Sequence, residues 1–308
     1  MGFSHKGDRH ALTVDVEDWH NATILQCTGR VEPPTTSVVR NTLALLELLG
    51  QHQAKATWFF LGEVAEAFPE LVRKVAEAGH EVGVHGFHHH PLHKFDAPAF
   101  KAQIARARTA VEQSAGKRVL GHRGVDFSLR KETEWALDVL AELGFLYDAT
   151  LFPVRTPRYG VSGAPLDAHR VALRDGRHIL EIPVSVADPC GVRIPFAGGG
   201  YFRMLPLAVT RSLFSLTARR RPVVFYLHPC EIEPESELGY LPDELSEQEK
   251  GMIRRCFRSE SRGRAQGARK LRVLLSKYRF DTIENVFLGG GMGELTVTTR
   301  KEDRTGHK

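Results

Sequence analysis

Two stretches of this chain concentrate residues that can bind a metal ion, and the first is rich in histidine. Residues 81–93 read EVGVHGFHHHPLH, with histidines at positions 85, 88, 89, 90 and 93. His85 and His89 are four residues apart, which places both imidazoles on one face of a helical turn. Two imidazoles and one carboxylate form a facial ligand set for Zn²⁺ or a similar divalent ion, with positions left open for water and substrate. Histidine pairs at this spacing also occur often as ordinary polar residues of a protein surface or core. A metal site therefore requires a carboxylate beside the pair.

The second stretch is VDVED, residues 14–18, which carries three carboxylates. In an extended strand Asp15 and Glu17 point to the same side, whereas Asp18 begins the following turn and can swing back. Carboxylates at one rim repel each other unless a cation or an arginine joins them, and both Arg123 and a metal ion would do so. The alternative is that Asp18 caps the following turn and Glu17 is solvated. The sequence leaves both interpretations open.

Together these groups point to hydrolytic chemistry. A metal ion with three protein ligands keeps a water molecule, polarises a carbonyl group and lowers the pKa of that water toward ~7. Asp15 is placed to take the proton, and His228 in FYLHPCE has a suitable ordinary pKa to protonate a leaving amine. In isolation, an LHP sequence is better explained by a hydrogen-bonded core histidine at a strand end. The combination predicts metal-assisted hydrolysis of an amide or an ester.

Short β-rich runs that alternate with helical patterns position these residues. The strand candidates are 11–16, 56–62, 81–86, 119–124, 145–150, 179–186 and 223–229. Helices are predicted over 37–50, 69–79 and 128–144, and Ser37 and Gly50 are the expected start and stop of the first. Strands that alternate with helices of this length indicate parallel strands joined by crossover helices, so we expect an α/β fold of the (β/α) barrel type.

In such barrels the catalytic groups lie at the carboxyl ends of the strands. Ionisable residues follow five of the predicted strands: Asp15, Glu17 and Asp18 the first, His85, His88 and His89 the third, Arg123 the fourth, Asp148 the fifth and His228 the last. Because these strand ends meet at one end of a barrel, we expect one shared pocket.

A length of 308 residues is compatible with one barrel domain. We predict a single domain over 11–285, preceded by a disordered segment 1–10 and followed by a tail 286–308. Within the domain, 235–270 is interpreted as a polar, partly mobile excursion, and a last helix is expected over about 267–278.

Composition limits the class of protein. A hydrophobic content of 42% and a charged content of 26% are typical of a soluble globular protein. The sequence shows no secretory signal pattern and no run of roughly 18 apolar residues, so we expect a cytoplasmic location. The four cysteines, Cys27, Cys190, Cys230 and Cys256, lie far apart without a CxxC pairing, which favours a reducing compartment over a disulfide framework.

The net charge of +5 is concentrated in 217–222 and 254–272. Such clusters can hold nucleic acid, anionic lipid or an acidic glycan. We expect no nucleic-acid binding, because the arginines are not interleaved with aromatic residues and no nucleic-acid motif occurs. Peripheral contact with an anionic membrane is a hypothesis that rests on charge alone.

Several segments in a fixed order carry a resemblance to a known family. They are LTVDVEDW, ATWFFLG, PELVRKVAEAGHEVGVHGFHHH, GHRGVDFSL, ALDVLAELGFLYDATLFPVRTPRYG and FYLHPCE. Together they resemble the polysaccharide deacetylase family, the NodB-homology group of metal-dependent carbohydrate esterases, from about residue 11 to about residue 285. AGGGYFRMLP and ESELGYLP add a likeness to the exopolysaccharide-biosynthesis branch of that family.

The resemblance implies a distorted (β/α) barrel, usually of seven strands, and a set of site residues. The implied roles are general base Asp15, metal ligands His85 and His89, base-orienting arginine Arg123, and general acid His228. The metal carboxylate is implied to be Asp18 or Glu17, because most members have two adjacent aspartates where this chain has Asp-Val-Glu-Asp. The implied pocket or support positions are Trp19, Phe127, Asp148, Tyr201 and Leu227.

Four positions depart from the family pattern. His88 stands where the branch usually has a small or acidic residue, so it could compete as a ligand, and Gly124-Val125 replaces an expected Ala-Pro. Asp126 follows where a small residue is common, and its carboxylate could weaken the pairing of the arginine with the base. His90 and His93 are assigned to the loop.

The resemblance implies removal of the N-acetyl group from an N-acetylhexosamine in a glycan or in a lipid-linked or nucleotide-linked precursor. Zn²⁺ is the expected ion, with Co²⁺, Ni²⁺ or Mn²⁺ as alternatives. A second hypothesis is removal of another acyl group such as formyl, or hydrolysis of a non-sugar amide, because the fold also hosts deformylases and cyclic-amide hydrolases. A third is a glycan-binding protein that has lost catalysis. Release of acetate or of formate distinguishes the hydrolases.

Overall fold

Strand β1 (Arg9–Val16) lies at the centre of the fold in a computed structural model that describes residues 9–232 and 241–289. Every residue of β1 after the first is buried, which is typical of a parallel strand with both faces covered. The strand begins at Arg9, inside the segment 1–10 that was predicted to be disordered. Residues 1–8 lie outside the described part of the chain.

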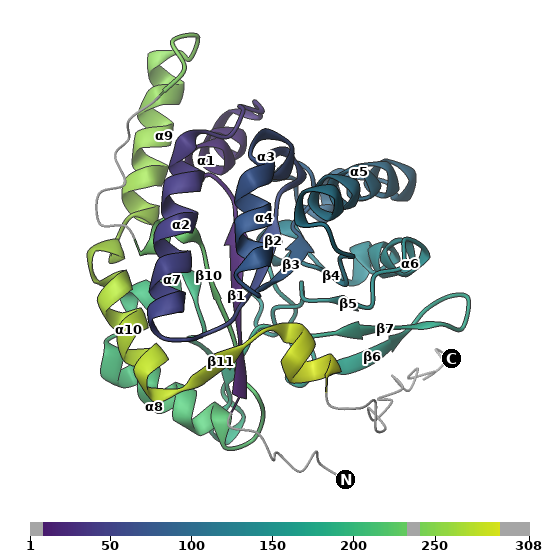
Figure 1. The fold of residues 1–308 in the computed structure, drawn as a ribbon, viewed down its shortest axis with the longest axis vertical. Coiled ribbons are helices and arrows are strands. Elements are labelled where there is room, and N and C mark those ends of the chain that lie inside the picture. The colour runs from purple at the N-terminus through teal and green to yellow at the C-terminus, as the bar shows by residue number, and fades with distance from the viewer. Residues whose placement is uncertain (1–8, 233–240, 290–308) are drawn as a thin grey trace, which may run out of the picture.

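Within the described residues, seven parallel strands form the wall of a barrel in the order β10-β1-β2-β3-β4-β5-β7 (Figure 1). Besides β1 they are β2 (Thr57–Phe60), β3 (Glu81–Val84), β4 (Gly121–His122), β5 (Tyr147–Asp148), β7 (His178–Glu181) and β10 (Val224–Leu227). Each one overlaps a predicted strand candidate. The expected α/β fold with a parallel sheet is therefore confirmed.

The barrel is distorted where it closes. Among the described residues β7 and β10 share no strand ladder; instead Ser185 N–H donates to Val224 O at 3.1 Å and Tyr226 N–H donates to Ala197 O at 2.9 Å. Irregular segments thus bridge the gap. The remaining strands are β6 (His169–Ala172) antiparallel to β7, the hairpin β8 (Val186–Ala187) and β9 (Ile194–Pro195), and β11 (Arg279–Asp281), which pairs with the start of β1.

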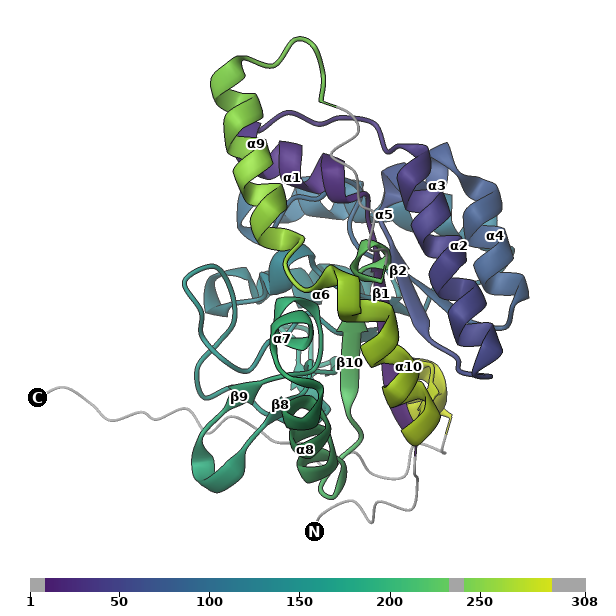
Figure 2. The same ribbon diagram turned by 90° about the vertical axis from the view of Figure 1, so that its left-hand side faces the viewer.

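Helices cover the outside of the barrel (Figure 1, Figure 2). They are α2 (Thr36–Gln51), α3 (Gly62–Ala67), α4 (Pro69–Glu77), α5 (Ala97–Ala115), α6 (Trp135–Glu142), α7 (Gly199–Met204), α8 (Leu207–Ala218) and α10 (Gly267–Lys277). Their inward side chains join those of the strands in one large apolar core, which includes Leu45, Trp58 and Phe225. None of the helices that the structure describes has the length and apolar character to cross a bilayer.

The boundaries of the predicted helices differ in detail. The N-cap of α2 is Thr35, whose hydroxyl accepts a hydrogen bond from the Ser37 amide, so the prediction that Ser37 is the cap was wrong. Helix α4 begins with Pro69 as expected. The predicted helix 128–144 is divided into a 3₁₀ turn (Lys131–Thr133) and α6.

The interval 235–270 contains a helix that the sequence analysis missed. Helix α9 (Glu247–Glu260) begins with a capping box, in which Ser246 Oγ accepts from the Glu249 amide while the Glu249 carboxylate accepts from Ser246. Ile253 and Phe257 bury one face of it. Helix α9 packs beside α1 (Trp19–Thr28) above the carboxyl ends of the strands (Figure 1, Figure 2). A Ser-x-x-Glu sequence before apolar residues is the feature that could have predicted it.

The carboxyl-terminal boundary also differs from the prediction. Strand β11 leads into a π-helical turn (Glu284–Leu288), so regular structure continues past the expected end of the domain at 285. Residues 290–308 of the expected tail lie outside the described residues.

Candidate functional site

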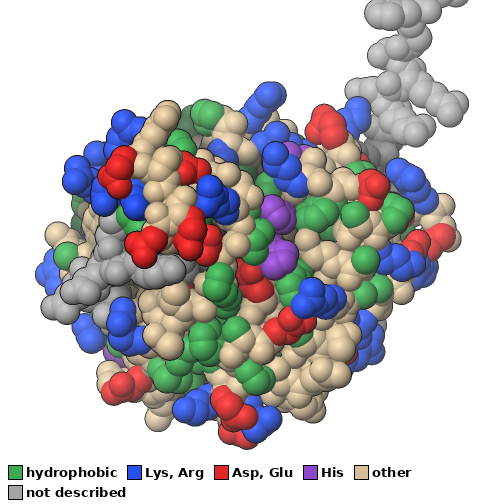
Figure 3. Space-filling view, turned by 90° about the horizontal axis from the view of Figure 1, so that it is seen from above, with side chains coloured by type: hydrophobic (Ala, Val, Ile, Leu, Met, Phe, Trp, Pro, Cys, Tyr) green, Lys and Arg blue, Asp and Glu red, His purple; other side chains and the backbone are tan. Residues whose placement is uncertain are grey.

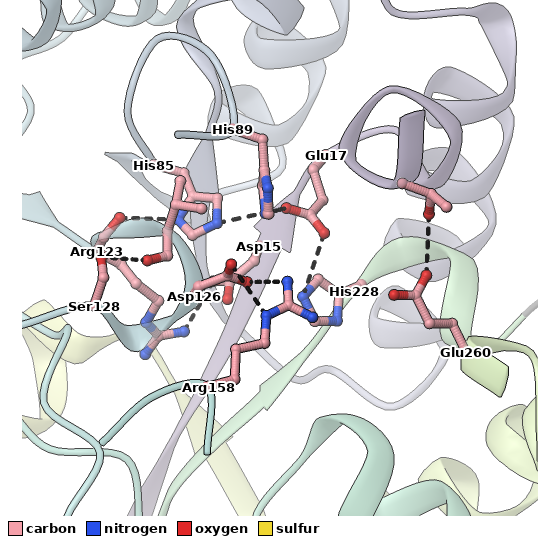
Figure 4. Close-up of polar contacts among 12 residues, drawn as sticks. Asp15, Glu17, His85, His89, Arg123, Asp126, Ser128, Arg158, His228 and Glu260 are labelled. Carbon is pink, nitrogen blue, oxygen red and sulfur yellow. Dashed lines mark hydrogen bonds and ion pairs between the residues drawn. The ribbon is translucent and has the colours of Figure 1, made fainter. Parts of the chain in front are cut away.

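Glu17, His85 and His89 bring their ligand atoms together at the carboxyl ends of β1 and β3 (Figure 4). One atom from each residue lies within 4.8 Å of the others. Glu17 Oε2 is 3.6 Å from His85 Nε2 and 2.6 Å from His89 Nε2. A carboxylate and two imidazoles that face one point are ligands that suit Zn²⁺ or a similar divalent ion.

The orientation of His85 is fixed by the neighbouring strand. Its Nδ1 lies 2.8 Å from the backbone oxygen of Arg123, which follows β4. Because a carbonyl oxygen can only accept, Nδ1 carries the proton and Nε2 faces Glu17. Metal-binding histidines commonly have their second nitrogen held in this way.

The surroundings of the Glu17 carboxylate show whether this ligand set suits a cation. Its Oε2 is buried and accepts no hydrogen bond of good geometry from the described residues, although His89 Nε2 is 2.6 Å away. Burial alone would raise the pKa of Glu17, but the charges of His89 and His228 hold that pKa well below its usual value. A buried anionic oxygen that converges with two imidazoles fits a divalent cation.

Asp18 lies elsewhere, although it is adjacent to Glu17 in sequence. Its Oδ2 accepts from the amide and the hydroxyl of Thr35 at 2.7 Å and 2.6 Å, and its Oδ1 accepts from the Ser37 hydroxyl at 2.9 Å. The carboxylate is fully buried at the start of α2, and these contacts occupy it. Of the two candidate metal carboxylates, the structure brings Glu17 and not Asp18 to the histidine pair.

Asp15 and Arg123 form a buried ion pair beside this set. Arg123 Nη1 donates to Asp15 Oδ1 at 2.9 Å and to Thr13 Oγ1 at 2.7 Å, and Arg123 Nε donates to Ala149 O at 3.0 Å. The guanidinium is fully buried and lies over the ring of Phe59, 4.7 Å from its centroid. The structure therefore brings these two predicted residues together and fixes the Asp15 carboxylate toward the cavity.

His228 lies on the opposite side of Glu17 from His85 (Figure 4). Its Nε2 is 3.6 Å from Glu17 Oε1 and its Nδ1 is 3.3 Å from Glu231 Oε1, which is in turn 3.3 Å from Arg203 Nε. Burial lowers the pKa of His228, but the carboxylates of Glu17 and Glu231 raise it to about 9. His228 therefore carries a proton at neutral pH in the absence of a cation.

These groups open into a cavity of about 220 Å³. Seen from above the strand ends, histidine side chains gather near the middle of this face with an acidic side chain beside them (Figure 3). The strand ends contribute Asp15, Glu17, His85, His89, Tyr226 and His228, the loops contribute Asp126, Phe127, Arg158 and Tyr159, and helices α1 and α9 contribute Ala22, Thr23, Gln26 and Glu260. We call the last four residues the α1–α9 wall.

Two departures from the family pattern have structural explanations. Asp126 pairs with Arg158, at 2.6 Å between Oδ1 and Nη2, and the Arg123–Asp15 pair stays intact. Asp126 has a left-handed backbone with φ of 56°, which turns its side chain toward this partner. His88 directs Nδ1 to Glu63 Oε2 at 2.5 Å, so it does not compete for the metal position.

The residues that were predicted to form the pocket lie in different places in the structure. Phe127 lines the cavity. Leu227 is fully buried in the core, because successive residues of β10 alternate between core and cavity. Asp148 is buried and binds His122 Nδ1 and Thr150 Oγ1, both at 2.7 Å, so it supports the β5 loop and does not line the cavity. Tyr201 stacks on Phe152 outside the cavity lining. The side chain of Trp19 lies outside the described part of the structure.

Sequence reasoning missed several cavity residues. Arg158, Tyr159, Glu231 and the α1–α9 wall come from loops and helices that had no readable function. Thr23 Oγ1 donates to Glu260 Oε2 at 3.0 Å across this wall, which joins residues 237 positions apart. No local pattern could have indicated that contact.

Two segments of the chain match known family models. Residues 32–147 match a family model described as polysaccharide deacetylase, and residues 149–288 match one described as a domain of unknown function, DUF3473. A peptidoglycan-N-acetylglucosamine deacetylase of Bacillus cereus is 39% identical over 75 residues, which are 24% of this chain and 27% of the relative. A chitooligosaccharide deacetylase of Rhizobium leguminosarum is 31% identical over 97 residues, or 32% of this chain and 42% of the relative.

Solved structures agree on the fold. A Mycobacterium smegmatis protein described as a candidate polysaccharide deacetylase has a TM-score of 0.52 and 26% identity, over 74% of this chain and 80% of that one. The chain spans well under half the length of the curated relatives named above.

Proposed function

We propose, from the match of residues 32–147 to the polysaccharide deacetylase family model, that this chain is a metal-dependent hydrolase that removes the N-acetyl group of an N-acetylhexosamine. The substrate is a glycan or a glycan precursor of exopolysaccharide biosynthesis, and Zn²⁺ is the proposed ion. The observation that carries the proposal is the convergence of Glu17, His85 and His89 beside the Arg123-held carboxylate of Asp15. Hydrolysis adds one water across the amide bond and releases acetate and a free amine.

The protein groups divide the proton transfers between them. Glu17, His85 and His89 would hold the cation, which supplies Lewis-acid polarisation of the acyl oxygen and a lowered pKa of water. Asp15 takes the proton of the attacking water, and Arg123 keeps the Asp15 carboxylate in position. His228 gives a proton to the departing nitrogen, with Glu231 holding its other ring nitrogen. Water is admitted through the cavity face shown in Figure 3.

The first test compares two adjacent carboxylates. Purified full-length wild type should contain about one divalent ion per chain by mass spectrometry, and Glu17→Gln and His85→Ala should lose it. Asp18→Asn is the matched control, and after a check of folding by circular dichroism it should keep the ion. Loss in Asp18→Asn with retention in Glu17→Gln would reverse the ligand assignment. Absence of binding even after Zn²⁺ reconstitution would favour the glycan-binding alternative.

The second test follows the chemistry. Asp15→Asn should keep the metal and lower the rate of acetate release from N-acetylhexosamine oligosaccharides by about 10²–10⁴-fold, because it removes the base. Acetate and formate are measured in parallel on acetylated and formylated substrates. Formate as the main product would replace the deacetylase by a deformylase on the same site, and unchanged acetate release would exclude Asp15 as the base.

A further inference from the structure

Two cysteines that are distant in sequence meet above the cavity. Cys27 lies in α1 and Cys256 in α9, 229 positions apart, and their sulfur atoms are 3.2 Å apart. Both are free thiols with partly exposed side chains, so a small reagent can reach them. The sequence shows no CxxC pairing, and the two thiols meet because α1 and α9 pack against each other in the fold.

The two thiols are in register with a contact that belongs to the cavity. Thr23 is four residues before Cys27, and Glu260, its hydrogen-bond partner at 3.0 Å, is four residues after Cys256. Helices α1 and α9 therefore run antiparallel, and the thiol pair lies one helical turn from the Thr23–Glu260 pair on the same facing surfaces. A bond between the sulfur atoms would fix the α1–α9 wall.

Among the described residues, a small apolar cluster and one ion pair accompany the two contacts at this seam. Its buried apolar residues are Ile24, Leu245 and Ile253, which form a cluster of their own apart from the main core. Arg30 and Glu249 form the next contact along the helices, at 3.9 Å in an exposed setting. A small satellite cluster separates at a lower free-energy cost than a barrel core, so a covalent link has a large effect here.

We propose that Cys27 and Cys256 form a redox-active dithiol that a small disulfide of the glutathione type oxidises to a reversible crosslink between α1 and α9. A cysteine thiolate attacks the small disulfide, forms a mixed disulfide and releases one thiol. The other cysteine then attacks the protein sulfur and releases the second thiol. Two protein thiols are oxidised by two electrons and one small disulfide is reduced to two thiols, so atoms and electrons balance.

The local chemistry disfavours Cys27 as the first nucleophile. Burial raises the pKa of the Cys27 thiol to about 12, with further contributions from Cys256 and from the Glu260 carboxylate. A disulfide requires about 2.0 Å between the sulfur atoms, so the sulfurs approach by roughly 1 Å from their present distance.

The test uses the full chain as purified, with its metal. The protein is equilibrated with reduced and oxidised glutathione in rising proportion, quenched with acid, alkylated under denaturing conditions and analysed by intact mass and peptide mapping. Four cysteines should be alkylated in the reduced chain and two in the oxidised chain, with Cys27 linked to Cys256. Cys190→Ser, which removes an exposed thiol elsewhere, should form the same crosslink. Cys27→Ser should instead hold glutathione on Cys256.

A second measurement asks whether the link fixes the wall. Oxidation of wild type should raise Tm by roughly 5 °C and slow amide hydrogen exchange of α1 at least about tenfold, with neither change in Cys27→Ser. No linked peptide in excess oxidised glutathione, or a link of Cys256 to another cysteine in equal yield, would overturn the dithiol. A crosslink without slower exchange in α1 would overturn its clamping role. Because neither readout depends on acetate release, this proposal and the proposed function fail separately.

Discussion

The cavity has a floor, formed by Asp15 and His85 at the strand ends, and a side formed by the α1–α9 wall. The barrel strands hold the floor, whereas the described contacts of the wall are mainly those between helices α1 and α9. In the floor, Asp15 and His85 are almost fully buried, and each is held by Arg123 through its side chain or its backbone. In the wall, Thr23 meets Glu260 through one hydrogen bond above a small apolar cluster. The groups that are proposed to take part in the chemistry are thus held at strand ends, whereas the α1–α9 wall rests on a weaker seam.

Hydrogen exchange gives the largest expected contrast between floor and wall. Backbone amides of β1 and β3 should exchange at least about 10²-fold more slowly than those of α1 and α9, because the wall can open without the barrel. Exchange followed by mass spectrometry on the reduced chain checks this. Equal protection in both regions would mean that wall and barrel unfold as one unit.

The ion pair in the floor should be costly to break. Arg123→Met leaves the Asp15 carboxylate buried without its partner and should lower the free energy of unfolding by about 3–5 kcal/mol in urea titrations. Arg158→Met is the matched control, because its side chain is 43% exposed and its pair with Asp126 should contribute less than about 1 kcal/mol.

A double variant separates charge from packing. If Arg123→Met fails to fold, Asp15→Asn combined with it should recover much of the stability, since no uncompensated charge is then buried. Failure of the double variant to fold would show that the arginine acts through packing against Phe59 and not through its charge.

Acid should destabilise the barrel through His80, which precedes β3. Its Nδ1 accepts from the Ala56 amide at 3.0 Å, and burial, with the charge of Lys55, lowers its pKa from 6.5 to about 4. Between these values the unfolded chain binds a proton that the folded chain does not. The contribution to stability is therefore present above pH 6.5 and is lost, by up to about 3 kcal/mol, as the pH falls toward 4.

Urea titrations at a series of pH values measure this loss. His80→Gln should flatten the profile between pH 6.5 and 4. His178→Gln, at an exposed position, should keep the wild-type profile. An unchanged profile in His80→Gln would assign the acid sensitivity to other groups.

The smallest effect is expected in the wall. Thr23→Val removes the hydroxyl that donates to Glu260 and should weaken the seam by about 1 kcal/mol, visible as faster exchange in α1. Global stability in urea should change by less than about 0.5 kcal/mol, since the barrel is untouched. A large global loss would show that the wall is part of the same folding unit as the floor.

Local patterns were sufficient for much of this molecule. The strands were predictable because short apolar runs between helical patterns mark parallel strands. Asp15, His85, Arg123 and His228 were predictable because they lie at the ends of those strands or directly after them. Helix α9 was also encoded locally by Ser246 and Glu249, and was missed because its charged residues suggested a loop.

The choice between Glu17 and Asp18 could not be made from sequence. Local sequence does not distinguish which of two neighbouring carboxylates at a strand end faces the histidines. In the structure the hydroxyls of Thr35 and Ser37 bind Asp18 at the start of α2, which leaves Glu17 beside the histidines. Likewise, only the fold shows that Asp126 pairs with Arg158 and leaves Arg123 to Asp15.

The sequence by itself determined the barrel, the histidine pair and the carboxylate, arginine and histidine at the strand ends, because each depends on spacing within one strand or turn. The tertiary structure alone decided which carboxylate joins the histidines, which residues line the cavity, and that Cys27 meets Cys256. Those relations join residues up to 237 positions apart, and they exist only once barrel closure has brought the helices of both ends of the chain together.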